Sequence, residues 1–193
     1  ERSEILDPVV SSDTQESRDE GYLQLSADQF HAVSDWHYFA ILNLIRTKSF
    51  KNDHGWIAGR LGLSAATVSD AIERLKRLGM VAESATSKLT RTARQFRTSD
   101  DVQSVALRKS HHQNLELARE ALETLSVEDR DFTWITLPLD QGKLPLAKSL
   151  IRKFQDDLVE ALGEQDDCTE VYRVAVQVFP LTKLLKNSKG KKV

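Results

Sequence analysis

The sequence predicts a mainly helical fold with a small β component, an α+β class, and three observations support this class. Residues 53–81 have the spacing of two short amphipathic helices joined by a tight turn. Directly after them, a polar turn at residues 84–88 separates two short segments with strand character. Residues 104–182 then alternate helical stripes with strand-like runs, which predicts a helix–strand–helix–strand order.

The helix pair at residues 53–81 indicates a class of partner. Three apolar side chains share one face of the first helix: Ile57, Ala58 and Leu61. Gly62 is expected to end this helix, because glycine adopts the left-handed conformation without steric cost. Ser64 is the expected N-cap of the second helix, whose apolar stripe is Val68, Ile72, Leu75 and Leu78. This is the layout of a helix-turn-helix, whose second helix reads the major groove of DNA.

The flanking segments extend the helix pair to a winged helix. Residues 80–83 and 89–92 are the expected strands of a wing hairpin. Ser26 and Gln29 have the spacing of a capping box, which predicts that one helix of about five turns begins there. A short edge strand is expected just before this helix. We therefore expect a winged helix-turn-helix domain over residues 21–97.

The rest of the chain is expected to form a linker and a second domain. Residues 1–20 are polar and acidic without periodicity, which is typical of a disordered linker. Residues 98–193 are the expected α+β C-terminal domain, for dimerisation or sensing. Its expected elements, after a polar connector at residues 93–103, are helices at 104–125 and 143–162 and strands at 132–139 and 170–179. Two strands cannot bury a sheet alone, so either residues 21–25 supply a third strand or a dimer completes the sheet.

Charge is distributed unevenly along the 193 residues. The net charge is −2, which taken alone argues against binding to nucleic acid. Residues 46–97, however, hold eleven Lys or Arg against four acids, a net of +7. Residues 1–45 carry −7 and residues 98–193 carry −2. The positive block coincides with the helix pair and the wing, as expected of a surface that contacts phosphates, although a solvated basic face is the alternative.

Several classes of function have no signature in the chain. No apolar run approaches the roughly 18 residues of a membrane span, and no secretory signal is visible. Cys168 is the single cysteine, which fits a reducing compartment, so we expect a cytoplasmic protein. The chain has no phosphate-binding glycine loop, nucleophile elbow or zinc-ligand spacing, so we expect no enzyme activity, no cofactor and no metal. His111 and His112 point about 100° apart on a helix, which favours a structural role over a shared metal.

Ten residues form the expected DNA-binding set, chosen because they are basic or lie at the start of the second helix. They are Lys48, Lys51, Arg60, Ser64, Thr67, Arg74, Lys76, Arg77, Lys88 and Arg91. The groove-facing end of the helix is small and carries no Asn or Gln, and Asp70 and Glu73 are unfavourable beside phosphates. We therefore expect backbone contacts and DNA shape to contribute heavily to recognition.

The chain also resembles a known family along most of its length. The matching stretches are DWHYFAILNLI (35–45), WIAGRLGLS (56–64), LRKSHHQNLELAREAL (107–122), DRDFTWITL (129–137) and VYRVAVQVFPLTK (171–183). They are similar to bacterial proteins that share a domain of unknown function, DUF4423. The resemblance implies a transcriptional regulator with no established ligand, reaction or operator. Members usually carry a further N-terminal region and this chain begins at Glu1, so we expect a fragment of a longer protein.

These observations lead to one expected function and one alternative. We expect a DNA-binding transcriptional regulator that binds double-stranded DNA through its winged helix as a homodimer. Two recognition helices would then lie in successive major grooves, about 34 Å apart. The alternative is an adaptor in which the same helix pair binds a protein partner, since winged helices serve both purposes.

Overall fold

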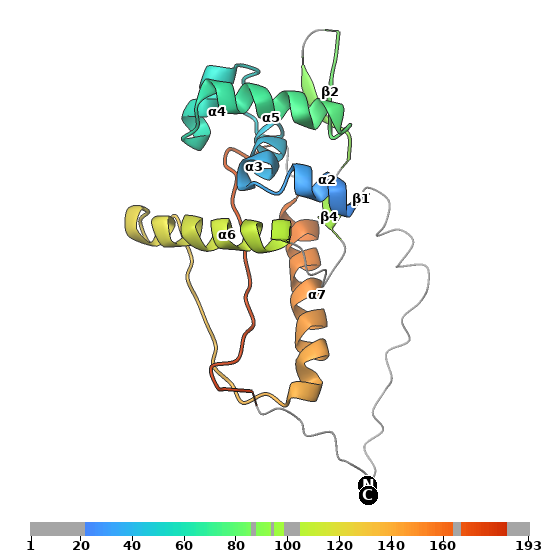
Figure 1. Cartoon of the computed structure of the whole chain (residues 1–193). Helices are drawn as coiled ribbons and strands as arrows, with labels where there is room; N and C mark the ends of the chain where they lie inside the picture. The colour runs from blue at the N-terminus through green and yellow to red at the C-terminus, as the bar shows by residue number, and fades with distance from the viewer. Residues whose placement is uncertain (1–21, 86–87, 94, 99–104, 164–166, 185–193) are drawn as a thin grey trace, which may run out of the picture. The chain divides into compact units, whose positions relative to one another are not determined.

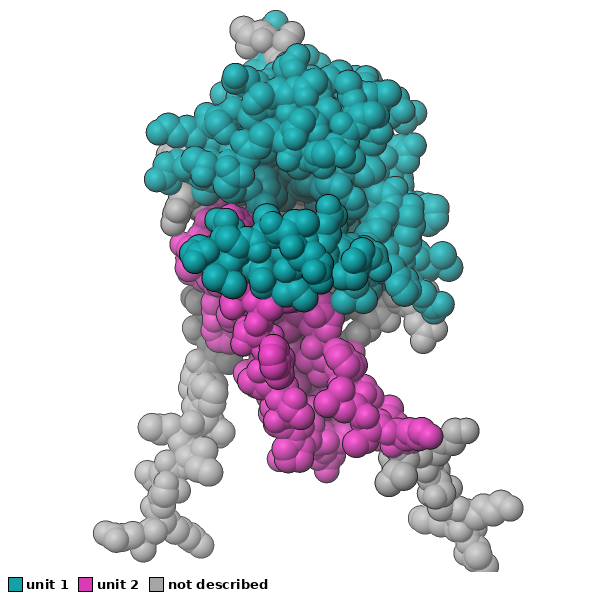
Figure 2. Space-filling model, turned by 90° about the vertical axis from the view of Figure 1, so that its left-hand side faces the viewer, with its two compact units in different colours: residues 1–130, 166–171 teal, residues 131–165, 172–193 magenta. Residues whose placement is uncertain are grey.

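The computed structural model describes residues 22–85, 88–93, 95–98, 105–163 and 167–184 (Figure 1). Over these residues the chain is mostly helical with two small sheets, which confirms the predicted α+β class. The chain divides into two compact units, coloured separately in Figure 2: unit 1 is residues 1–130 with 166–171, and unit 2 is residues 131–165 with 172–193. The linker predicted at residues 1–20 lies outside the described residues. None of the described helices is long and apolar enough to cross a membrane.

Unit 1 contains the predicted helix pair and hairpin in the predicted order. Together with the helix before them, they form five elements that we call the helix–hairpin module: α3 (Trp36–Leu44), α4 (His54–Leu61), α5 (Ala65–Arg77), β2 (Val81–Glu83) and β3 (Leu89–Arg91). Gly62 ends α4 in the left-handed conformation, with φ of 65°. Ser64 caps α5 by accepting a hydrogen bond from the Thr67 amide at 3.0 Å. β2 and β3 pair antiparallel, with Val81 opposite Arg91.

The core of unit 1 is built around α5. Val68, Ile72 and Leu75 are at most 2 % exposed and pack against α3 and α4. The hairpin is joined to this core by Met80 and Leu89, which are also buried. Each such side chain contributes about 1.5 to 3 kcal/mol through removal from water. This burial directs the opposite face of α5 outward.

The single helix predicted from Ser26 is wrong, since two helices occupy that segment. They are α2 (Ala27–Ala32) and α3, separated at residues 33–35. The capping box at Ser26 and Gln29 is present as predicted. The break is stabilised from outside the segment, because the Gln113 side chain accepts a hydrogen bond from the Trp36 amide at 2.9 Å and donates one to Asp35 at 2.7 Å. The start of α3 is thus capped by a residue 77 positions away.

The edge strand predicted near residue 22 is present, with an unexpected partner. β1 (Tyr22–Leu25) pairs in parallel with β4 (Gln95–Thr98), and Tyr22 lies opposite Gln95. The segment at residues 93–103 was expected to be a connector, so β4 corrects that expectation in part. Within the described residues β1 pairs with β4 alone, so it does not supply the third strand of a sheet with residues 132–139 and 170–179, which was one of the two predicted arrangements.

The first helix of the predicted C-terminal domain belongs to unit 1. α6 (Val105–Thr124) contacts α2 and α3. Lys109 forms an ion pair with Asp35 at 2.6 Å, beside the hydrogen bond that Gln113 donates to the same carboxylate. The boundary between the compact units therefore falls after Arg130, whereas the sequence placed it after residue 97.

Unit 2 contains a short 3₁₀ helix, η1 (Gln141–Lys143), and α7 (Leu144–Leu162), which confirms the predicted helix at 143–162. The two predicted strands are wrong, since residues 132–139 and 170–179 have no strand hydrogen bonding. Both run as extended chain (Figure 1). A strand requires a hydrogen-bonding neighbour, and the described part of this chain places none beside either segment.

Candidate nucleic-acid interface

The start of α5 presents small side chains to solvent. Ala65, Ala66 and Asp70 are exposed on the face opposite the core. The hydroxyls of Ser64 and Thr67 lie 2.8 Å apart and bind each other, while Ser64 also caps the helix. Both candidate residues are therefore part of the capping structure. The small side chains allow a partner surface to approach this end of α5 closely, but few of them are long enough to form hydrogen bonds with the edges of DNA bases.

Two of the eight candidate cations are held within the fold by aromatic and polar contacts. Arg74 donates a hydrogen bond to the Ala32 carbonyl at 3.1 Å, and its guanidinium lies 5.8 Å from the centre of the Tyr38 ring. Arg60 binds the Glu170 carboxylate at 2.6 Å and lies 5.4 Å from the centre of the Trp56 ring. Each arginine thereby joins separate segments of unit 1. Either arginine would have to break these bonds before it could contact a DNA phosphate.

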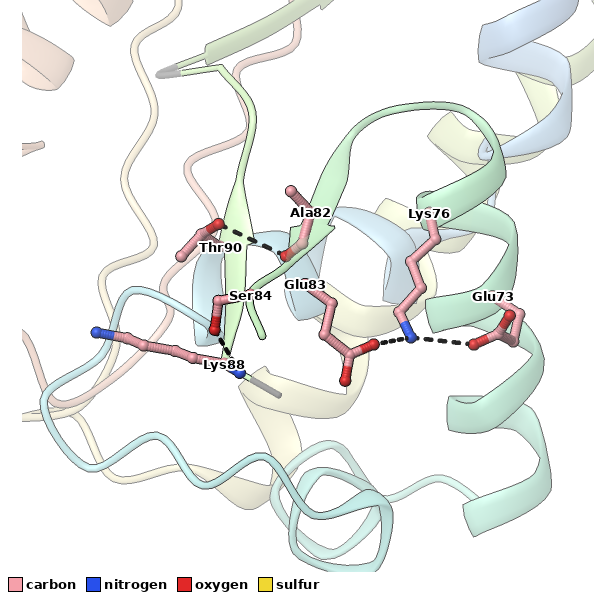
Figure 3. A network of polar contacts seen from close by, with 7 residues as sticks. All are labelled: Glu73, Lys76, Ala82, Glu83, Ser84, Lys88 and Thr90. Atoms are coloured by element: carbon pink, nitrogen blue, oxygen red, sulfur yellow. Dashed lines mark hydrogen bonds and ion pairs between the residues drawn. The ribbon is translucent and has the colours of Figure 1, made fainter. Parts of the chain in front are cut away.

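Lys76 is a third engaged cation, at the last turn of α5. Its ammonium lies 3.2 Å from Glu73 and 2.5 Å from Glu83 on β2 (Figure 3). The hydrogen bond to Glu83 is the largest influence on the pKa of Lys76 and raises it above its ordinary value, with Glu73 acting in the same direction. The two carboxylates offset the charge of this lysine, so it contributes little to a positive surface.

Arg91 is half-buried and turned toward α3. It donates a hydrogen bond to the Asn43 side chain at 3.0 Å. Burial, together with the charge of Arg46, lowers the pKa of Arg91 to about 10, so it remains charged at neutral pH. Arg46, Lys88 and Arg91 line an open hollow of about 420 Å³ between the end of α3 and β3.

The remaining four cations are exposed, and none forms a side-chain ion pair within the described residues. They are Lys48, Lys51, Arg77 and Lys88, which we call the open cations. The main chain positions two of them: the Lys48 amide donates to the Cys168 carbonyl at 2.8 Å, and the Lys88 amide donates to Ser84 at 3.0 Å. The Lys88 side chain extends away from the hairpin (Figure 3). The structure thus separates the eight candidate cations into four engaged and four open.

Sequence reasoning missed the polar cluster that joins α6 to α3. Burial is the largest single influence on the pKa of Asp35 and acts to raise it, but the hydrogen bonds from Lys109 and Gln113, together with the nearby positive charge, hold this pKa below its ordinary value. Nearby, burial is the largest influence on the pKa of His37 and lowers it. The dipeptide Ser34-Asp35 is an N-cap signal that marks the helix break, but the contact with Gln113 has no local signal. His111 and His112 are exposed, and the described residues contain no cluster of metal-binding side chains.

The comparisons with known proteins give one match. The family model described as "Domain of unknown function (DUF4423)" matches residues 17–181, which cover most of both units. No curated protein and no solved structure matches the chain. Because the family model covers most of the chain, the protein belongs to the DUF4423 family.

Proposed function

We propose that this protein is a DNA-binding transcriptional regulator whose helix–hairpin module acts as a winged helix on double-stranded DNA. One observation carries the proposal: a helix pair with an exposed second helix lies in a strongly basic part of the chain, residues 46–97, and four cations of that part are open. In this mode of binding, α5 enters the major groove and the hairpin contacts the flanking backbone. The open cations then hold phosphates.

The side chains favour phosphate contacts over direct base readout. Exposed Ala65 and Ala66 permit a close approach of α5 but carry no hydrogen-bonding group. Sequence preference would therefore come mainly from DNA shape and deformability. A homodimer would place two copies of α5 about 34 Å apart on successive major grooves. Such a regulator would act in the cytoplasm, where bacterial DNA is found.

The second candidate function is a protein-interaction adaptor. The observation that favours it is that part of the positive charge of the module is already neutralised, because Arg60 and Lys76 are paired with carboxylates. Exposed Asp70 and Glu73 also lie on the outer face of α5, where they would repel phosphates. An adaptor would use this face to bind a protein partner.

Salt dependence distinguishes the two functions. The full 193-residue chain is titrated into a fluorescein-labelled duplex of random sequence, and anisotropy is recorded at about 50 mM and about 200 mM salt. Micromolar binding that weakens steeply with salt is expected if the open cations bind phosphates, since each contact releases a counterion. The absence of binding at low salt would exclude DNA binding by this chain and favour the adaptor.

A further inference from the structure

Unit 2 has an unusually large exposed apolar surface. None of its described residues is buried, although α7 is amphipathic and the adjoining segments are rich in aromatic and β-branched residues. Sixteen large apolar side chains, from Phe132 to Leu184, are at least 41 % exposed. At roughly 60 Å² each, they expose on the order of 1,000 Å². Monomeric proteins rarely carry so much in one region, whereas a standard protein interface buries about 800 Å² on each partner.

The exposed face of α7 has the form of a helix-packing surface. Leu146, Leu150 and Phe154 follow each other at intervals of four residues and are 58 %, 59 % and 49 % exposed. Leu162, two turns further along, is 59 % exposed. Side chains four residues apart form the ridges that pack into the grooves of a neighbouring helix. α7 therefore presents a continuous apolar stripe, which the described part of unit 2 leaves uncovered.

Charge along α7 and its preceding residue indicates what covers the stripe. Residues 143–153 contain four Lys or Arg and no acid. Residues 154–162 contain three acids and no Lys or Arg. Lys153 and Asp157, at the boundary between the two halves, form an ion pair within α7 at 2.7 Å. Two copies of α7 packed antiparallel would in addition place each basic half beside the acidic half of the other copy. A parallel arrangement would place like charges together, which is unfavourable.

We propose that α7 is the centre of a homodimer interface, in which the α7 helices of two copies pack antiparallel through Leu146, Leu150 and Phe154. The same association covers the extended segments at residues 132–139 and 172–179, whose alternating side chains are otherwise exposed. The charge pattern makes this surface self-complementary, as a twofold interface requires. The inference deepens the dimeric form of the proposed function and does not depend on DNA binding.

A charge exchange between two variants tests this interface. One variant carries Lys143→Glu with Lys153→Glu, and the other carries Asp157→Lys with Glu160→Lys; all four residues are exposed. The matched control carries Arg108→Glu with Arg119→Glu, two exposed positions on α6 in unit 1. Light scattering coupled to gel filtration gives the mass of the full chain in the absence of DNA, so that its outcome is separate from that of the DNA titration.

We expect the unsubstituted chain and the control to have twice the chain mass of 21.8 kDa. Each α7 variant alone is expected at the mass of one chain, because like charges then meet across the interface. Each variant also loses the Lys153–Asp157 ion pair within α7, a loss that mixing cannot restore. An equimolar mixture of the two is therefore expected to return to twice that mass only if the charges complement each other between copies. Recovery in the mixture also shows that the variants are folded. The proposal is overturned if the unsubstituted chain is monomeric, if either α7 variant alone remains dimeric, or if the control is monomeric. It is also overturned if the mixture remains monomeric.

Discussion

Removal of two open cations should reduce the salt dependence of DNA binding, whereas removal of two engaged cations should not. The test pair is Arg77→Gln with Lys88→Gln, both exposed and without an ion pair within the described residues. The matched pair is Arg60→Gln with Lys76→Gln, whose charges are bound by Glu170, Glu73 and Glu83. Each pair removes one arginine and one lysine from unit 1, so the net charge changes equally.

The expected magnitude follows from counting phosphate contacts. Each contact on duplex DNA contributes about 0.9 to the slope of log affinity against log salt, so the loss of two contacts should flatten the slope by about 1.8. Between about 50 mM and about 200 mM salt, that difference corresponds to roughly a tenfold smaller loss of affinity. The matched pair is expected to leave the slope unchanged, because its cations are already neutralised within the fold.

The assay is anisotropy of a labelled duplex at four or more salt concentrations, with circular dichroism confirming that both variants are folded. The comparison of slopes is the informative quantity, since a change in affinity at one salt concentration also reports any loss of stability. Equal slopes for the two variant pairs would refute the division into open and engaged cations. Binding would then depend on the overall charge of the module and not on the particular side chains.

Three further predictions concern the stability of unit 1, measured by urea unfolding. Gly62→Ala should lower the free energy of unfolding of unit 1 by about 1 kcal/mol. The cost comes from the left-handed backbone conformation alone, because an added Cβ at Gly62 has no neighbour within 4 Å. Gly59→Ala, inside α4 and equally unobstructed, should instead raise this free energy. Gln113→Ala should lower the free energy of unfolding by about 1 to 2 kcal/mol, because it removes the cap of the Trp36 amide. His112→Ala, at an exposed position on the same helix, should leave it unchanged. Equal effects of the two substitutions would contradict the capping role. The lowered pKa of Asp35 means that its ionised form stabilises the fold above its ordinary pKa of 3.8, and that this contribution disappears as pH falls through the lower folded value. Asp35→Asn should therefore destabilise at pH 7 and should have a progressively smaller effect in acid; a difference independent of pH would contradict this account.

Local sequence signals predicted the ends of helices well. Gly62 and Ser64 were expected to end α4 and begin α5, and both do so. These features depend on partners within three to five residues, such as the bond from the Thr67 amide to Ser64. The apolar stripe of α5 could also be predicted from the sequence, because the spacing of its apolar residues specifies which face of the helix is buried.

Contacts between distant segments engage three of the candidate cations, Arg60, Arg74 and Arg91, whereas Lys76 is bound by carboxylates three and seven positions away. Arg74 was expected at the DNA surface, yet its bonding partner Ala32 lies 42 positions away. Arg60 binds Glu170 across 110 positions. A basic residue in the sequence carries no information on whether a distant carboxylate or carbonyl will bind it, so the candidate set could be narrowed only after folding.

The sequence by itself determined the α+β class, the order of the helices and hairpin in the helix–hairpin module, and the basic character of that module. These properties depend on periodicity, capping and composition, which act over a few residues. The tertiary structure decided which residue caps the start of α3, the pairing of β1 with β4, and the absence of strand pairing at residues 132–139 and 170–179. The physical reason is that a cap from Gln113 or a neighbouring strand is supplied by a distant part of the molecule. Alternation of side chains makes a segment suitable for a sheet, but the sheet forms only where a second strand is present to bind it.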